Sequence, residues 1–304
     1  MTTTTAAQAQ TPSPFDLADA DSYRRWRDAR LAAAPRSIDE LIVEVQDPRR
    51  LSETEFEAIL ARCRRANMAI YVSQAGDDPD KSIPAALGAR FGLYRLDHNR
   101  GADEDAITSL KVRTDAAHAR YIPYSNRPIA WHTDGYYNAP DRQIHGFLLH
   151  CIHAAEAGGA NALLDHEVAY CLVRDQDPQF IAALMHPECM TIPATADEGG
   201  DTGAELRPEQ SGPVFSVRPD GRLHMRYTNR ARNIRWRDDA LTAAAVDCLK
   251  TLLAAPSPWH LEGRLESGWG LISNNVLHTR SGFTDGAVPR LLYRARYYDR
   301  IAGT

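Results

Sequence analysis

The sequence predicts an α+β fold in which a strand-rich core is surrounded by peripheral helices. Short apolar runs, alternating or continuous, recur along the 304 residues and are typical of strands. Longer amphipathic stretches that begin with capping residues lie between several of these runs and predict helices. Neither a Gly-x-Gly-x-x-Gly motif nor a phosphate-binding loop occurs, which disfavours an open parallel nucleotide-binding sheet.

The chain is predicted to begin with a disordered tail, residues 1–20, whose first part is rich in Thr, Ala, Gln and Pro. This tail has neither the basic start nor the apolar segment of a signal peptide. Because no internal repeat or linker follows it, residues 21–304 are predicted to form a single domain that is long enough to bury a sizeable core.

Capping signals set the boundaries of the predicted helices. Ser52 and Glu55 form a capping box at the start of the second helix. Asp177 caps a helix that has Pro178 in its first turn, and the first helix stops at Pro35. The helices are predicted at residues 21–34, 52–66, 166–175, 178–185 and 239–254.

The strands are predicted from apolar runs bounded by turn residues. The turn Pro219-Asp220-Gly221 joins two of these runs into a hairpin. Residues 194–212 contain acidic residues and glycines but few large apolar side chains, and this composition predicts a mobile loop. The strands are predicted at residues 40–45, 68–73, 107–112, 144–152, 160–164, 214–218, 223–227, 270–273 and 290–298.

The bulk composition excludes several classes of partner. A formal net charge of -5, with a pI near 6.1, argues against nucleic acid and anionic membranes as partners. No apolar run approaches the ~18 residues of a membrane-spanning helix. The five cysteines are scattered and odd in number, which favours free thiols in a reducing, cytoplasmic setting. Whether the chain forms a homo-oligomer is left open.

A metal site is predicted from His132, Asp134 and His278. Residues two apart on a strand point to the same side, so the first two could hold one ion together. A third ligand 146 positions later completes the 2-His-1-carboxylate set of non-haem Fe(II) oxygenases, although spacing alone leaves zinc, manganese and nickel open. A double-stranded β-helix (jelly-roll) core brings such distant strands face to face, and we therefore predict this core.

Two other triplets, His186 to Glu188 and His260 to Glu262, fit the same local pattern with glutamate. Pro187 would disrupt a central strand, which counts against the first triplet. Glu262 is only sixteen residues before His278, which leaves little chain for a barrel. The interpretation of any single such triplet as a surface histidine remains open without further context.

Three arginines, Arg290, Arg294 and Arg296, recur at even spacing in the last predicted strand and would lie on one face. Inside a barrel they need anionic partners, and a guanidinium suits a carboxylate well. A solvent-exposed strand with ordinary surface arginines is the alternative.

These residues resemble the taurine/2,4-dichlorophenoxyacetate dioxygenase family of Fe(II)/2-oxoglutarate oxygenases. The resemblance covers roughly residues 129–298, more than half of the chain. Its carriers are Trp131-His132-Thr133-Asp134, Gly158-Gly159-Ala160-Asn161, the segment from Gly268 to Phe283 that contains His278, and Arg290-x-x-x-Arg294.

The resemblance implies that His132, Asp134 and His278 bind iron and are the catalytic centre. It implies that Arg290 holds the distal carboxylate of the cosubstrate 2-oxoglutarate and that Arg294 lies near the substrate anion or the cosubstrate. Asn161 stands where the family usually has threonine, and its amide can also donate to a carboxylate. The implied reaction uses O2, releases succinate and CO2, and hydroxylates a small anionic or zwitterionic metabolite.

Further substrate contacts are predicted at Tyr124 and Asn126, which precede the metal triplet, and at Arg230, in an arginine-rich stretch. An ordinary polar surface loop or a salt-bridged interface would explain the same residues. Three other functions also remain open: a desaturation, cyclisation or C–N/C–S cleavage with the same cofactors, a non-catalytic metal-binding jelly-roll protein, and a zinc hydrolase.

Overall fold

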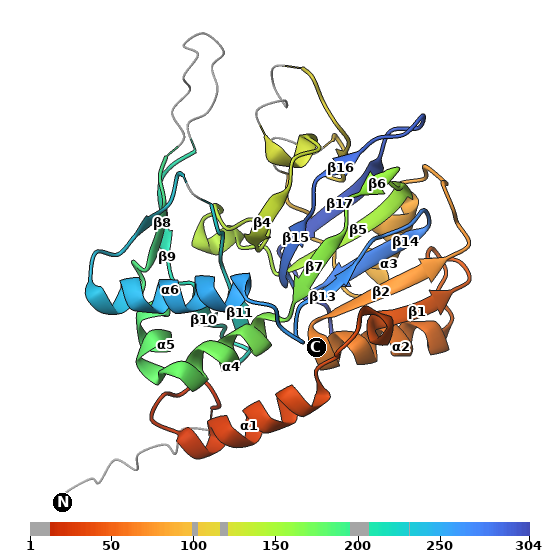
Figure 1. The fold of residues 1–304 in the computed structure, drawn as a ribbon. Coiled ribbons are helices and arrows are strands. Elements are labelled where there is room, and N and C mark those ends of the chain that lie inside the picture. Colours follow the sequence, from red (N-terminus) through yellow and green to blue (C-terminus); the bar gives the residue numbers. More distant parts are fainter. Residues whose placement is uncertain (1–12, 99–102, 116–120, 195–206, 231) are drawn as a thin grey trace, which may run out of the picture.

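Two facing β-sheets form the centre of the molecule, and the computed structural model describes residues 13–98, 103–115, 121–194, 207–230 and 232–304 (Figure 1). The larger sheet has the order β1 (Ile42–Val45), β2 (Met68–Ser73), β14 (Trp269–Ser273), β5 (Gly146–His153), β17 (Leu291–Tyr297) and β3 (Thr108–Leu110). The smaller sheet has the order β13 (Leu261–Gly263), β7 (Asn161–Leu164), β15 (Leu277–Arg280) and β4 (Ile129–His132). Only the β1–β2 pair is parallel among the pairings of these two sheets.

The two faces of the larger sheet are both buried, but against different partners. Alternate residues of β5 and β17 turn inward and pack with residues of the smaller sheet. Phe147 of β5 and Leu292 of β17, for example, share a cluster with Leu163 of β7. The intervening residues, such as Leu148 and Tyr293, pack outward against α2 (Glu53–Ala66) and α3 (Ser82–Arg90). The strands are therefore rich in apolar residues on both faces.

A second cluster lies beside the sheets and is formed by four helices and several short strands (Figure 1). The helices are α1 (Ala20–Ala33), α4 (His166–Gln176), α5 (Pro178–Leu184) and α6 (Ala240–Ala254). The strands are β8 (Met190–Ile192), β9 (Gln210–Gly212), β10 (Phe215–Val217), β11 (Leu223–Met225) and β12 (Arg235–Trp236). Outside this cluster, β6 (Ala157–Gly158) and β16 (Phe283–Thr284) form a separate two-stranded sheet. Aspartate side chains cap the starts of these four helices, as capping at helix N-termini predicts.

The five predicted helices are all present, with ends that differ from the prediction by two residues or fewer. The capping box at Ser52 is formed, and the hairpin around Pro219-Asp220-Gly221 is β10–β11, with Gly221 at a φ of 78°. The nine predicted strands all contain a strand, although residues 38–41 form a 3-10 helix and shorten the first one.

Two predictions about irregular segments are wrong in part. The predicted tail at 1–20 is ordered from residue 13, because Phe15 packs edge-on against Trp26 and Tyr170 at 5.0 and 5.5 Å between ring centroids. Residues 1–12 lie outside the described residues. In the predicted loop at 194–212, residues 195–206 also lie outside them, but residues 210–212 are not loop, since they form β9 against β8.

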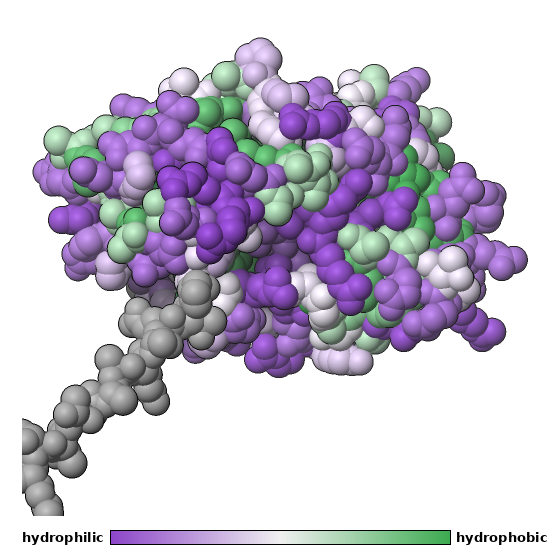
Figure 2. All heavy atoms as spheres, turned by 90° about the horizontal axis from the view of Figure 1, so that it is seen from below, coloured by the Kyte–Doolittle hydropathy of each residue, from purple (hydrophilic) through white to green (hydrophobic). Residues whose placement is uncertain are grey.

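Three features of the described residues bear on the composition: helix length, surface polarity and the pairing of the cysteines. No helix among the described residues is long and apolar enough to cross a membrane. Figure 2 shows a mostly hydrophilic face with small separate apolar patches. Four of the five cysteines are buried, all five are free, and burial raises the pKa of the Cys63 thiol to about 12.

Candidate metal centre

His132, Asp134 and His278 meet at one point at the side of the smaller sheet. One ligand atom from each residue lies within 4.8 Å of the other two. His132 on β4 and His278 on β15 are directly opposed in the antiparallel ladder, and their ring centroids are 4.2 Å apart. His132 Nε2 is 3.6 Å from Asp134 Oδ1. The ladder between neighbouring strands therefore brings together residues that are remote in sequence.

Asp134 reaches this point by a route that the strand argument does not describe. β4 ends at His132, so Asp134 lies in the turn after the strand and not two positions along it. Asn275 fixes the turn: its Oδ1 accepts from the backbone N–H of Asp134 at 2.8 Å, and its Nδ2 donates to the carbonyl of Asp134 at 2.9 Å. Gly135 follows with a φ of 67°, which favours glycine.

Both imidazoles are oriented by their own strands. Nδ1 of His132 lies 2.9 Å from the carbonyl of Ala130, and Nδ1 of His278 lies 3.0 Å from that of Val276. A carbonyl can only accept, so each Nδ1 carries a proton, and Nε2 is the nitrogen of each ring that can bind a metal. Phe147 stacks on His278 at 4.8 Å between ring centroids. Burial and the neighbouring His132 lower the pKa of His278 to about 3, which keeps it neutral.

The carboxylate of Asp134 is ionised and almost without hydrogen bonds. Burial opposes the charge, yet Arg294, whose Nη1 is 3.4 Å from both carboxylate oxygens, helps to hold the pKa of Asp134 well below its usual value. Its Oδ2 is buried and accepts no hydrogen bond from the described residues. Two imidazole nitrogens and a buried carboxylate oxygen without a hydrogen bond are donors that a divalent transition metal prefers, so the residues fit an iron ion.

The two competing triplets do not form such a group. Among the described residues, the set of His132, Asp134 and His278 is the only cluster of three metal-binding side chains at this spacing. His260 packs instead against Trp131 at 5.0 Å between ring centroids, and Glu188 donates its backbone N–H to His186. The choice made from sequence context therefore agrees with the geometry.

Three arginines, Arg290 just before β17 and Arg294 and Arg296 on its inner side, lie in three different settings: Arg290 and Arg296 are buried, and Arg294 is partly buried. Arg296 pairs with Asp97 and donates to the hydroxyl of Tyr137, so its charge is compensated within the fold. Arg294 lies beside Asp134. Arg290 is 6% exposed, and no described residue accepts a hydrogen bond from its guanidinium or pairs with it. A buried cation without a partner is costly, which makes Arg290 the strongest candidate to bind an anion.

The glycine pair before Asn161 makes room for this arginine. Gly158 and Gly159 have φ values of 75° and 73°. A Cβ at Gly158 would lie 2.2 Å from the carbonyl oxygen of Gly282, and one at Gly159 would lie 3.4 Å from Nε of Arg290. The motif Gly-Gly-x-Asn thus permits the close approach of β6 to β16 beneath the guanidinium.

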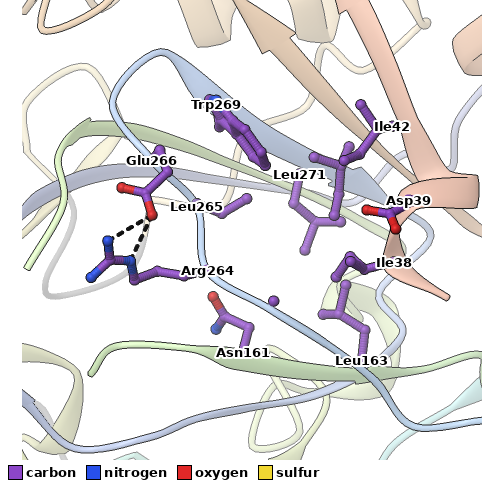
Figure 3. Close-up of a pocket in the computed structure, with 12 residues that line it drawn as sticks. Ile38, Asp39, Ile42, Asn161, Leu163, Arg264, Leu265, Glu266, Trp269 and Leu271 are labelled. Carbon is purple, nitrogen blue, oxygen red and sulfur yellow. Dashed lines mark hydrogen bonds and ion pairs between the residues drawn. The ribbon is translucent and has the colours of Figure 1, made fainter. Parts of the chain in front are cut away.

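Asn161 is near this region but is already engaged. Its amide donates to the carbonyl of Thr279 at 2.7 Å. Its side chain lines a cavity of about 250 Å³ between the two sheets, with Leu163, Trp269 and the ion-paired Arg264 and Glu266 (Figure 3). None of the three candidate metal ligands lines this cavity. The role of Asn161 in holding a cosubstrate stays a prediction.

The predicted substrate contacts differ in their position. Tyr124 is buried at 5% exposure, and the charges of Arg294 and Arg296 act on its hydroxyl. Arg230 is exposed and lies over the ring of Tyr136 at 5.7 Å. Asn126 is exposed, and its backbone carbonyl accepts from the N–H of Phe283 at 3.1 Å. Arg294, the fourth predicted contact, lies beside Asp134, and Tyr124 is the one of the other three on which the charge of Arg294 acts.

Sequence reasoning missed Arg280, two residues after His278. Its guanidinium is buried and donates to backbone carbonyls of Pro123, Ser125 and Arg127. Burial and the charge of Arg290 lower the pKa of Arg280 to about 9. The arginine stands inside the segment that carries the family resemblance, but its partners are main-chain atoms about 155 residues away, which no local pattern indicates.

Comparisons with known proteins agree with this geometry. The family model described as "Taurine catabolism dioxygenase TauD, TfdA family" matches residues 35–296. A uridine-5'-phosphate dioxygenase from Amycolatopsis sp is 31% identical over 280 residues, which cover 86% of this chain and 97% of that protein. A uridine-5'-phosphate dioxygenase from Streptomyces sp is 28% identical over 225 residues, 69% of this chain and 77% of that protein.

Solved structures share the fold at lower identity. A structure of AAD-2 in complex with Mn(II) and N-oxalylglycine has a TM-score of 0.60 at 12% identity, over 86% of this chain and 97% of that one. Asparagine oxygenase, in complex with Fe(II), a hydroxyasparagine and succinate, has a TM-score of 0.55 at 16% identity, over 94% of this chain and 86% of that one. The chain therefore belongs to the TauD, TfdA family of dioxygenases and is a non-haem iron oxidoreductase that uses 2-oxoglutarate and O2.

Proposed function

We propose that this enzyme hydroxylates a small phosphorylated metabolite, with a nucleoside 5'-monophosphate such as uridine 5'-phosphate as the first candidate, and releases succinate and CO2. His132, Asp134 and His278 hold the iron on a double-stranded β-helix scaffold. The observation that carries the proposal is the convergence of these three side chains within 4.8 Å. The bound iron supplies the activation of O2 by oxidative decarboxylation of 2-oxoglutarate.

The protein's own residues orient the reactants. The unpaired guanidinium of Arg290 binds the distal carboxylate of 2-oxoglutarate, because a planar fork of donors matches a carboxylate. The apolar inner residues, such as Leu149 and Leu292, keep water away from the region between Arg290 and the metal centre. Asn161 is a weaker candidate for cosubstrate contact, since its amide is already donated to Thr279.

A phosphorylated, ring-bearing substrate suits the groups around the metal centre. Arg294 beside Asp134 and the exposed Arg230 supply positive charge in a chain whose net charge is negative. The ring of Tyr136 lies under Arg230, so a bound base could stack on it in place of that guanidinium. The relatives named as uridine-5'-phosphate dioxygenases match most of the chain, which supports this substrate class.

The first test is spectroscopic. Anaerobic addition of Fe(II) and 2-oxoglutarate should give a weak visible charge-transfer band, which should be absent in His132→Ala. In air, uridine 5'-phosphate should then stimulate succinate formation more than uridine, taurine or asparagine does. No band in the wild type would contradict the assigned site, and equal stimulation by uridine and its phosphate would remove phosphate from the substrate class.

The outcome at the substrate can be read from a second product. Hydroxylation at the carbon that carries the phosphate ester yields an unstable product that releases phosphate, whereas hydroxylation elsewhere retains the ester. Measuring inorganic phosphate beside succinate therefore separates hydroxylation that retains the ester from hydroxylation that leads to its loss. Turnover of either kind would exclude a protein that binds metal without catalysis.

A further inference from the structure

Arg280 makes an unusual set of contacts for a buried arginine. Its Nη2 donates to the carbonyls of Ser125 and Arg127 at 2.6 Å each, and its Nη1 donates to the carbonyl of Pro123 at 3.4 Å. The residue is 6% exposed, and no acidic side chain among the described residues pairs with it. Its charge is thus compensated by main-chain dipoles alone.

These carbonyls belong to one segment, residues 121–128, which we call the entrance segment. It leads directly into β4, which ends at His132. It also carries Tyr124, whose carbonyl accepts from the N–H of Arg113 at 2.9 Å. Arg280 reaches three carbonyls of this segment, those of Pro123, Ser125 and Arg127, with one side chain. This side chain is therefore a tether of the segment.

Arg280 also shares a neighbour with Arg290. The guanidinium carbon of each lies 4.9 Å from the ring centroid of Phe283. Two buried cations on one ring repel each other, and the carboxylate of Asp285, which accepts from the backbone N–H of Arg290 at 2.8 Å, offsets only part of the charge of Arg290. An anion at Arg290 would relieve that repulsion and let Arg280 keep its place beneath the entrance segment.

We propose that Arg280 is a positioning residue that couples binding of the 2-oxoglutarate anion at Arg290 to fixation of the entrance segment beside the metal centre. The inference rests on the cosubstrate role proposed for Arg290. The coupling is reciprocal: the bound dicarboxylate steadies the segment, and a steady segment favours the bound dicarboxylate.

Hydrogen exchange of the wild-type enzyme tests the coupling without any substitution. With Fe(II) present and oxygen absent, adding 2-oxoglutarate should slow exchange of amides in residues 121–128 several-fold. Exchange in α2, which packs behind the larger sheet against β1 and β2, should stay unchanged (Figure 1). An entrance segment that does not respond would overturn the proposal even if every variant of Arg280 proved unstable.

Variants then separate tethering from general stability. Arg280→Gln should raise the half-saturating 2-oxoglutarate concentration about tenfold, the size of an ordinary coupling between two sites. It should also abolish the slowed exchange. Arg280→Lys keeps the charge but not the planar fork, so it should bind 2-oxoglutarate closer to wild type while the segment no longer responds. The matched control Arg264→Gln removes another half-buried arginine that bonds a backbone carbonyl, and it should behave as wild type.

The results distinguish this inference from the function on which it rests. A wild type without the charge-transfer band contradicts the proposed site itself. Suppose instead that the band is normal, that Arg280→Gln binds 2-oxoglutarate as the wild type does, and that 2-oxoglutarate still slows exchange at 121–128 in this variant. That result contradicts only the coupling. A normal band with both effects lost in Arg280→Gln and retained in Arg264→Gln supports it.

Discussion

The two sides of β17 show how one strand serves two purposes. Its outward residues Tyr293, Ala295 and Tyr297 pack with the helices of the apolar cluster behind the larger sheet. Its inward residues include Arg294 and Arg296, which are buried near Asp134 and Tyr137. Both sides exclude water, but only the inner side buries charge. Stability is thus concentrated on the outer side and chemistry on the inner side, and substitutions on the two sides should have separable effects.

The largest separation is expected for His278→Ala, on the inner side of the smaller sheet. Removing one of the three ligands should lower the metal affinity by more than the ~10- to 100-fold that is typical when a residue hydrogen-bonded to a ligand is replaced. Succinate formation should fall below detection while the melting temperature of the metal-free protein changes little. Iron content by atomic absorption and succinate by chromatography are the measurements. Stoichiometric iron in the variant would show that His278 is not a ligand.

The opposite pattern, a loss of stability without a loss of iron or cosubstrate binding, is expected for Leu148→Ala on the outer side of β5. Leu148 is fully buried behind the larger sheet, so the truncation leaves a cavity and should lower the free energy of unfolding by ~2–5 kcal/mol. Denaturant unfolding measures this change. At a temperature where the variant is folded, its charge-transfer band and 2-oxoglutarate requirement should match the wild type. A large change in either would mean that the two sides are not separable.

Arg290→Gln should affect cosubstrate binding more than stability. Loss of a charge-assisted pair of hydrogen bonds, worth ~1.5–3 kcal/mol, should raise the 2-oxoglutarate requirement by about 10- to 100-fold. The variant also removes an unpaired buried cation, so its unfolding free energy should not fall. Arg264→Gln is the control. An unchanged requirement would move the carboxylate-binding role to another residue, with Arg294 the next candidate.

A pH-dependent effect on stability alone is expected from buried histidines outside the metal centre. Burial lowers the pKa of His150 and His166 to about 4, below the value near 6.5 of an unfolded chain. Between pH 6.5 and 4 the unfolded state therefore binds more protons, and stability falls as the pH falls, by ~1.4 kcal/mol per pH unit for each histidine. Denaturant unfolding across this range measures the slope. His150→Gln should reduce it, and an identical slope would contradict the assignment.

The sequence indicated the helices and most strands because their signals are local. Asp19, Asp165 and Asp239 cap helices within their own segments. The helix α3 was missed because Pro84 and Gly88 interrupt a helical pattern. The short strands β8, β9 and β12 exist only through pairing with one another, which periodicity over two or three residues does not reveal.

The sequence predicted the parts of the candidate site that side chains form. It did not predict the parts that hydrogen bonds to the backbone hold in place. The triad and Arg290 belong to motifs, and the structure brings the triad together. Three other features depend on main-chain atoms: the turn that places Asp134, the hydrogen bonds from Asn275 to that turn, and the hydrogen bonds from Arg280 to the entrance segment. Such contacts follow from the folded path of the chain and leave no signature in residue spacing.

The unequal shielding of the two imidazoles has a consequence for iron loading. His278 is packed under Phe147 and is 7% exposed, whereas the side chain of His132 is 13% exposed. We expect the ion to enter and leave along the His132 flank, and small chelators to strip it from there. Iron would then enter and leave the enzyme on the His132 side, and His278 would be the last ligand to dissociate from it.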